Sequence, residues 1–203
     1  DQDMIREKYE AVWKQIAERF AKYDEHLIFE SMNEEFDGTY DGDPNKEYYA
    51  NLNQYNQIFV DTVRGTGEKN THRWLLVPGW NTNIEYTIGD YGFEMPTDEK
   101  CSAGESRMMV SVHYYDPWDY CGIEDLKTIL WGEYGDNLIE VNGFPKMNKA
   151  KWGDESYLDD LFSRMQEKFV KNDIPVIIGE YGCIDKSSAY ADFAGQIQGN
   201  RAY

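Results

Sequence analysis

The sequence of 203 residues has few of the residues that build metal centres and disulfide frameworks. It contains three cysteines and three histidines, has no C-x-x-C pair, and spaces its histidines far apart. An odd number of cysteines cannot all pair within one chain, so one disulfide plus a free thiol and three free thiols both stay open. Because zinc-site spacing is missing, we expect neither a metal nor another cofactor.

Positive charge and long apolar runs are also scarce. The chain has 20 Lys and Arg against 38 Asp and Glu, a formal net charge of −18. Nucleic-acid phosphates are bound by clustered basic residues, so we expect no nucleic-acid partner. No stretch reaches the roughly 18 uninterrupted apolar residues of a membrane span, so we expect no membrane partner. The first residues do not form a signal peptide, which leaves the compartment open.

What the sequence does have is apolar and aromatic residues in ordered patterns. Hydrophobic residues make up 41% of it and aromatic residues 15%, which excludes a disordered acidic tail. Apolar residues recur at helical spacing in three segments, and four shorter apolar runs have the character of buried strands. The helical segments are 4–20, 48–63 and 157–170, and the strand-like runs are 26–32, 73–78, 108–113 and 174–179. This alternation predicts an α/β fold with parallel strands covered by helices.

Polar side chains gather where these strand-like runs end. Asn33 and Glu34 follow the first run, Asn81 the second, His113 to Tyr115 the third and Glu180 the fourth. In parallel α/β folds, and above all in (β/α)8 barrels, the carboxyl ends of the strands form the active-site edge. We therefore expect these side chains to face one site.

Two of these residues are carboxylates, which suits hydrolysis of a glycosidic bond. That reaction needs one carboxyl group to protonate the leaving oxygen and a second to attack the anomeric carbon or activate water. His113 and Tyr115 could hold one carboxylate in its working state. Flat apolar faces for sugar rings could come from loop tryptophans, namely Trp80, Trp118 and Trp131.

Each of these residues also has an ordinary interpretation. Glu34 and Glu180 could be solvated loop carboxylates, Asn33 a turn cap, and His113 a core histidine. Either Tyr114 or Tyr115 is expected to pack inside. Trp80 and Trp118 could equally stack on a sugar ring or have no contact with substrate. Trp131 is expected to pack within its loop. We expect core positions for three others: Trp13, Trp74 and Trp152.

In combination, three motifs resemble glycoside hydrolase family 5, the family of endoglucanases and related β-glycanases. They are 27–34 (LIFESMNE), 112–115 (VHYY) and 175–182 (PVIIGEYG), and 78–80 (PGW) is similar to the endo-β-1,4-glucanase and xyloglucanase branch. The resemblance implies a retaining hydrolase with Glu34 as acid/base and Glu180 as nucleophile. It also implies that Asn33 contacts the sugar 2-OH. It further implies a β-glucan or xyloglucan substrate and, because such polymers cannot enter a cell, secretion.

Two departures from the family pattern stand out. Glu35 occupies the position after the Asn-Glu pair where the family usually has proline. A second carboxylate there could raise the pKa of Glu34 by like-charge repulsion, or it could simply face solvent. The larger departure is that the four strands correspond to strands four to seven of an eight-stranded barrel, which typically takes roughly 250 residues.

The resemblance therefore covers residues 1–203 as one partial catalytic domain, without counterparts of strands one to three and eight. An open four-stranded sheet would expose apolar edges. We expect the chain to pair with a complementary segment or with a second copy of itself. The alternative to an active enzyme is thus a barrel fragment that has no catalytic activity by itself, or a remnant that binds glycan through Trp80 and Trp118.

Overall fold

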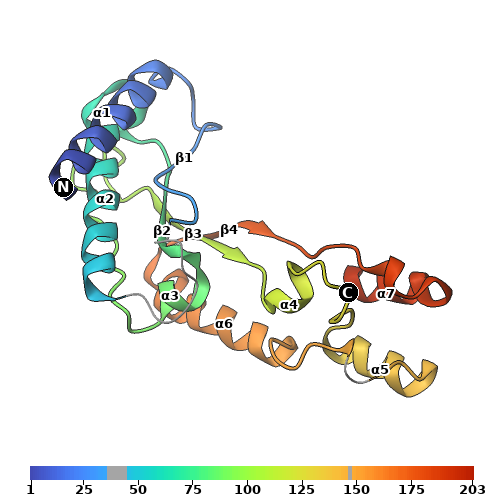
Figure 1. Cartoon of the computed structure of the whole chain (residues 1–203). Coiled ribbons are helices and arrows are strands. Elements are labelled where there is room, and N and C mark those ends of the chain that lie inside the picture. Colours follow the sequence, from blue (N-terminus) through green and yellow to red (C-terminus); the bar gives the residue numbers. More distant parts are fainter. Residues whose placement is uncertain (36–44, 146–147) are drawn as a thin grey trace. The chain divides into compact units, whose positions relative to one another are not determined.

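The computed structural model describes residues 1–35, 45–145 and 148–203. They form two compact units: unit 1 comprises residues 1–113 and 165–179, and unit 2 comprises residues 114–164 and 180–203. Figure 1 labels the helices α1 (Gln2–Phe20), α2 (Lys46–Gly65), α3 (Ile84–Ile88), α4 (Trp118–Cys121), α5 (Gly132–Asn142), α6 (Glu155–Lys168) and α7 (Ala194–Ala202). The strands are β1 (Phe29–Glu30), β2 (Leu75–Asn83), β3 (Met108–Tyr114) and β4 (Val176–Tyr181), and short 3-10 turns are η1 (Glu68–Thr71), η3 (Val170–Asn172), η4 (Ser187–Ala189) and η5 (Ala191–Phe193).

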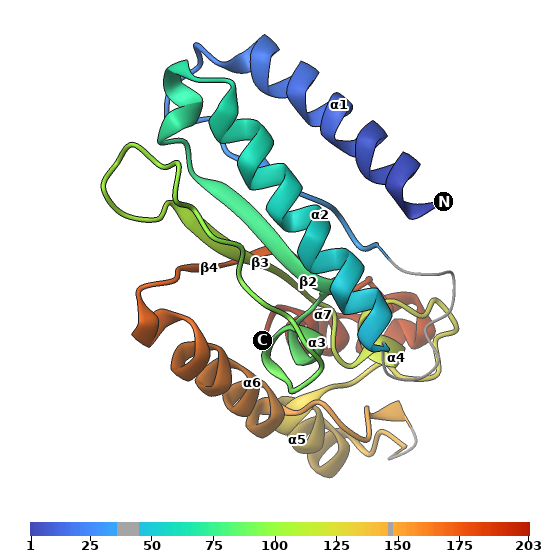
Figure 2. The ribbon, with the colours of Figure 1, turned by 90° about the vertical axis from the view of Figure 1, so that its left-hand side faces the viewer.

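Unit 1 is built on a sheet whose strands follow the chain order β1-β2-β3-β4. The pairs β1–β2 and β2–β3 are parallel, as the continuous apolar runs predict. Figure 2 shows α1 beside α2, with α2 lying along β2. Their apolar faces and the strands share one buried core, formed by Ala17, Phe29, Phe59, Val60, Val63, Leu75, Val77 and Met108.

The helices of unit 1 begin where the sequence offers a cap. The side chain of Asp1 accepts a hydrogen bond from the backbone N–H of Asp3, and that of Asn45 accepts one from Tyr48. Such caps satisfy N–H groups that have no partner inside the helix. The three predicted helical segments are confirmed within two residues of their observed starts and ends.

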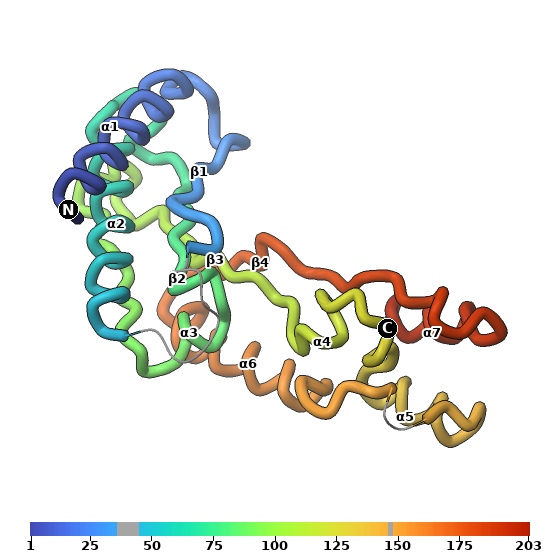
Figure 3. Tube along the Cα trace, in the orientation of Figure 1, coloured from blue at the N-terminus to red at the C-terminus, as the bar shows by residue number. Residues whose placement is uncertain are grey.

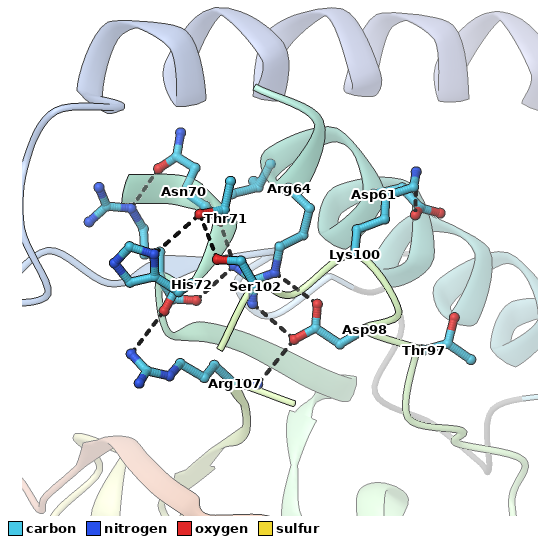
Figure 4. A network of polar contacts seen from close by, with 12 residues as sticks. Asp61, Arg64, Asn70, Thr71, His72, Thr97, Asp98, Lys100, Ser102 and Arg107 are labelled. Atoms are coloured by element: carbon cyan, nitrogen blue, oxygen red, sulfur yellow. Dashed lines mark hydrogen bonds and ion pairs between the residues drawn. The ribbon is translucent and has the colours of Figure 1, made fainter. Parts of the chain in front are cut away.

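A buried ion pair fastens α2 to the segment that leads into β3 (Figure 4). Arg64 donates from Nε and Nη2 to the two carboxylate oxygens of Asp98, over 2.8 and 2.9 Å. Its third nitrogen donates to the carbonyl oxygens of Asn70 and Arg73. Both side chains of the pair are buried, so the hydrogen bonds compensate charges that water cannot reach.

Unit 2 has its own small apolar core, which lies around α5 and α7. The buried residues are Ile129, Leu130, Leu138, Phe144 and Ile197. Asn200 of α7 fixes the start of α5, because its side chain accepts from the N–H of Trp131 and donates to that residue's carbonyl. Figure 3 follows the chain through α4, α5 and α7. No element was predicted between residues 121 and 153, so α5 is an addition.

The observed strands differ in extent from the predicted runs. The first run covers seven residues, but only Phe29 and Glu30 form strand. The second and fourth runs continue further than predicted, to Asn83 and Tyr181. Among the described residues, none of the helices combines the length and apolar character needed to cross a bilayer.

Candidate active site

Unit 1 brings together Glu34 and His113, two of the predicted site residues. His113 lies near the end of β3 and is buried, and its Nδ1 is 2.8 Å from Oε1 of Glu34. The Glu34 side chain is 38% exposed, so its carboxylate contacts His113 and is also open to solvent. A buried imidazole that fixes an accessible carboxylate is an arrangement suited to proton transfer.

The backbone around Glu34 is held in a conformation that ordinary residues avoid. Glu34 has φ +46°, and Asn81 and Thr82 both have φ +53°. A β-branched residue such as Thr82 rarely adopts this left-handed region. Thr82 is fully buried, and its Oγ1 accepts a 3.0 Å hydrogen bond from the backbone N–H of Glu34. Strain of this kind gathers at functional sites, where surrounding structure enforces it.

Unit 2 brings together Tyr115 and Glu180, the other predicted pair. The phenol of Tyr115 donates a 3.0 Å hydrogen bond to Oε2 of Glu180. Both side chains are partly buried, and Trp118 meets the Tyr115 ring edge-to-face at 6.1 Å. This hydrogen bond fixes the orientation of the Glu180 carboxylate.

The end of β4 is packed against the end of β3 within unit 1. A Cβ atom at Gly179 would lie 3.6 Å from Nε2 of His113 and 3.5 Å from Oγ of Ser111. The strand therefore runs within van der Waals distance of the imidazole. Glu180 follows Gly179 directly in the chain.

The remaining predicted residues lie in different surroundings. Asn33 is exposed, and Asn81 is half-buried with its side-chain oxygen enclosed. Trp80 is half-buried and stacks on Tyr48, with ring centroids 4.9 Å apart and an angle of 12°. Trp118 is 55% exposed and lies over Gly122. Trp118 therefore has the open face that sugar stacking requires.

The other tryptophans confirm the prediction in part. Trp13 packs against Phe29 and Phe59 of the unit 1 core, and Trp131 donates from Nε1 to the carbonyl of Gly153, 2.5 Å away. Trp74 is half-buried. The prediction of a core position for Trp152 is wrong, because this side chain is 48% exposed.

Glu35 lies next to Glu34 in the chain, and its sequence position alone did not decide whether its carboxyl group faces solvent. The solvent-facing interpretation is wrong, because both of its carboxylate oxygens are enclosed. Burial raises the pKa of Glu35 to about 7, and the negative charges of Glu30 and Glu34 add to the rise. No basic group among the described residues pairs with it. The neighbour of Glu34 is therefore a carboxylic acid that keeps its proton at mildly acidic pH and loses it around neutral pH.

The three cysteines are free thiols in the structure. Cys121 is partly buried, and loss of solvent together with the nearby Cys183 raises its pKa to about 12. A thiol with so high a pKa is a poor nucleophile.

Comparison with known proteins gives a family match. The family model described as cellulase, glycosyl hydrolase family 5, matches residues 1–200. Endoglucanase A of Paenibacillus barcinonensis is 53% identical to this chain, and the match covers 93% of this chain and 46% of that protein. The xyloglucan-specific endo-beta-1,4-glucanase BoGH5A of Bacteroides ovatus is 35% identical, and the match covers 90% of this chain and 34% of that protein.

Solved structures give the same result. A family 5 xyloglucanase from Paenibacillus pabuli, in complex with ligand, is 50% identical with a TM-score of 0.88, and the match covers 100% of this chain and 54% of that one. The chain thus spans about half the length of these relatives or less. By its sequence and by its fold, the chain belongs to glycosyl hydrolase family 5.

Proposed function

We propose that this chain carries the two catalytic carboxylates of a retaining, secreted endo-β-1,4-glucanase that acts on β-glucan or xyloglucan. The observation that supports it most directly is the pairing of each carboxylate with a polar partner from the end of β3. Glu34 contacts His113, and Glu180 contacts Tyr115. The names of the relatives support the substrate class, since they include an endoglucanase and two xyloglucanases.

The first half of the reaction transfers the sugar to the enzyme. Glu180 attacks the anomeric carbon as the bond to the leaving oxygen breaks, and Glu34 gives its proton to that oxygen. Tyr115 holds the attacking carboxylate by its 3.0 Å hydrogen bond. The partly exposed carboxyl group of Glu34 can reach a bound substrate while His113 keeps it in place.

The second half releases the sugar. Glu34, now ionised, takes a proton from water, whose oxygen attacks the anomeric carbon and displaces Glu180. This double displacement retains the configuration of the sugar. It requires the carboxyl groups of Glu34 and Glu180 to stand about 5–5.5 Å apart in the working enzyme.

In this proposal the polar and aromatic residues around the carboxylates bind the glycan. Asn33 is exposed next to Glu34, where it can contact the 2-OH of the sugar, and Asn81 lies at the strained end of β2. Trp118 offers an open ring face, and Trp80 offers the face that Tyr48 does not cover. Equatorial pyranosides present apolar C–H faces, which stack on such rings.

Variants of the two carboxylates test the roles separately. For Glu34→Ala, we expect hydrolysis of polymer to fall by roughly 10²–10⁴-fold, the usual contribution of general acid–base catalysis. Azide should restore turnover of an aryl cellobioside with a good leaving group and give the β-glycosyl azide. For Glu180→Ala, azide should instead give the α-glycosyl azide.

A matched control is Glu25→Ala, which removes an exposed carboxylate outside the site and should leave activity unchanged. If Glu180→Ala hydrolyses polymer at the rate of the unmodified protein, Glu180 is not the nucleophile. Products with inverted configuration would contradict the retaining mechanism.

The second candidate function is a barrel fragment that becomes catalytic only with a complementary segment. It is favoured by the number of strands, because the described residues supply four of the eight strands of a (β/α)8 barrel. It is also favoured by the match to only 46% of Endoglucanase A. Under this candidate the same carboxylates act, but the missing strands complete their surroundings.

A further inference from the structure

Trp152 is an exposed tryptophan in unit 2 with no assigned role. Its side chain is 48% exposed, although tryptophan is usually well covered in folded proteins. It precedes α6 and lies in the segment between Ala150 and Asp154. A single exposed apolar ring is common on protein surfaces, so the surroundings of Trp152 decide whether it can bind a ligand.

The ring of Trp152 is held in place by its neighbours. Tyr157, in the first turn of α6, meets it edge-to-face with ring centroids 5.6 Å apart and an angle of 85°. The phenol of Tyr157 also contacts Oδ2 of Asp116 at 3.4 Å. A ring that is fixed before binding loses little conformational entropy when a ligand stacks on it.

The backbone beside Trp152 runs against the turn that carries the predicted site residues. Gly153 has φ +71°, and a Cβ atom there would lie 3.0 Å from Cδ of Pro117. Pro117 stands between Asp116 and Trp118 in that turn. The carbonyl of Gly153 is also held by Nε1 of Trp131 at 2.5 Å. Trp152 is therefore anchored next to the loop that bears Tyr115 and Trp118.

Exposed aromatic faces and carboxylates are combined at this place. Trp118 is 55% exposed, and Asp116 and Asp154 lie in the two touching segments. A β-linked glucan offers both matching surfaces, since its rings have apolar faces and its equatorial hydroxyls donate hydrogen bonds to carboxylates. Asp116 accepts a hydrogen bond from the phenol of Tyr157, and Asp154 accepts from the hydroxyl of Ser156. Each carboxylate has further lone pairs that the hydroxyls of a glucan can use.

We propose that Trp152 is a further sugar-stacking platform, which binds a glucose unit of a β-1,4-glucan chain beyond the units held next to the two catalytic carboxylates. The inference rests on the proposed function for its substrate class. It extends that function by making Trp152 a determinant of the chain length that the site recognises.

Binding measured in a catalytically silent background tests the inference. In Glu180→Gln protein, we would compare the affinities of cellotriose and cellohexaose by calorimetry, with and without Trp152→Ala. We expect the affinity for cellohexaose to fall by about tenfold, equal to about 1.4 kcal/mol. The affinity for cellotriose should change little, and Trp152→Phe should restore much of the loss.

Two controls make the result interpretable. Tyr23→Ala removes an exposed aromatic side chain from unit 1 and should leave both affinities unchanged. Circular dichroism of each variant verifies that it folds, and the Phe variant retains an aromatic ring if the Ala variant does not fold.

The outcomes separate this inference from the proposed function. Equal losses for both oligosaccharides, or no loss for either, would overturn the platform at Trp152 while leaving the carboxylate roles intact. Full hydrolysis by Glu180→Gln protein would instead reject the proposed mechanism. If neither oligosaccharide binds, the inference is rejected as well, because a platform without glucan affinity is not a platform.

Discussion

At the scale of single residues, Glu35 is a carboxyl group held in an environment that disfavours its charged form. Its pKa is raised to about 7, above the ordinary value of 4.5, because burial disfavours the charged form. Below pH 4.5 both the folded and unfolded chains keep this proton. Between pH 4.5 and 7 only the folded chain keeps it, so the free energy of unfolding falls as pH rises and levels off above pH 7.

Glu35→Gln removes this titration and keeps the shape of the side chain. We expect the free energy of unfolding of the variant to equal that of the unmodified chain at pH 4. At pH 8 it should be larger, by at most on the order of 3 kcal/mol. Urea unfolding at a series of pH values measures the difference. An identical pH dependence in both proteins would show that Glu35 does not hold its proton in the folded state.

The residue scale also shows what could be predicted from sequence at the site. Glu34 and Glu180 follow continuous apolar runs and His113 ends one, so their place at or just beyond the carboxyl ends of strands could be inferred without a structure. The burial of Glu35 and the exposure of Trp152 could not. They depend on contacts between segments far apart in the chain, such as that of Gly153, next to Trp152, with Pro117, and no local pattern encodes them.

At the scale of elements, the long helices were predictable because their apolar residues recur at three- and four-residue steps. Helix α5 was not, because it contains Gly132 and Gly135, which weaken helix propensity. A Cβ atom at Gly135 would lie 3.1 Å from the side chain of Leu130, so close packing accounts for the glycine. Tertiary contact with α7 then stabilises what the sequence disfavours.

The attachment of α2 to the segment before β3 depends on the Arg64–Asp98 pair (Figure 4). Burial alone would raise the pKa of Asp98, but hydrogen bonds from Arg64 and from the backbone N–H of Arg107 outweigh it and lower the pKa. Arg64→Met leaves this charge buried without its cationic partner, with only the N–H of Arg107 still donating to it. We expect a loss of about 3–5 kcal/mol in the free energy of unfolding, measured by urea denaturation at pH 7.

A nearby exposed pair provides the matched control. Lys100 and Asp61 form a 2.9 Å ion pair with side chains 60% and 45% exposed. Lys100→Met should cost at most about 1 kcal/mol, because water already solvates both charges. Similar losses for Arg64→Met and Lys100→Met would mean that burial of the Arg64–Asp98 pair has no special importance.

At the scale of the whole molecule, the sheet has an incompletely covered edge strand. Val110 and Val112 of β3 are fully buried, whereas Val176, Ile177 and Ile178 of β4 are only half-buried. Continuous apolar strands of parallel sheets are normally covered on both faces. An additional strand beside β4 is therefore what the second candidate function requires.

Complementation tests that requirement directly. We expect the 203-residue chain alone to elute above its 23.8 kDa mass in gel filtration, because exposed apolar strand edges self-associate. Adding a separately produced segment with the other four strands should give a complex of one copy each and raise β-glucan hydrolysis. Ile178→Lys places a charge on β4 and should prevent both effects, whereas Ile28→Lys changes an exposed residue ahead of β1 and should prevent neither. A chain that stays monomeric and hydrolyses β-glucan unaided would exclude the fragment, because its four strands would then suffice for the site.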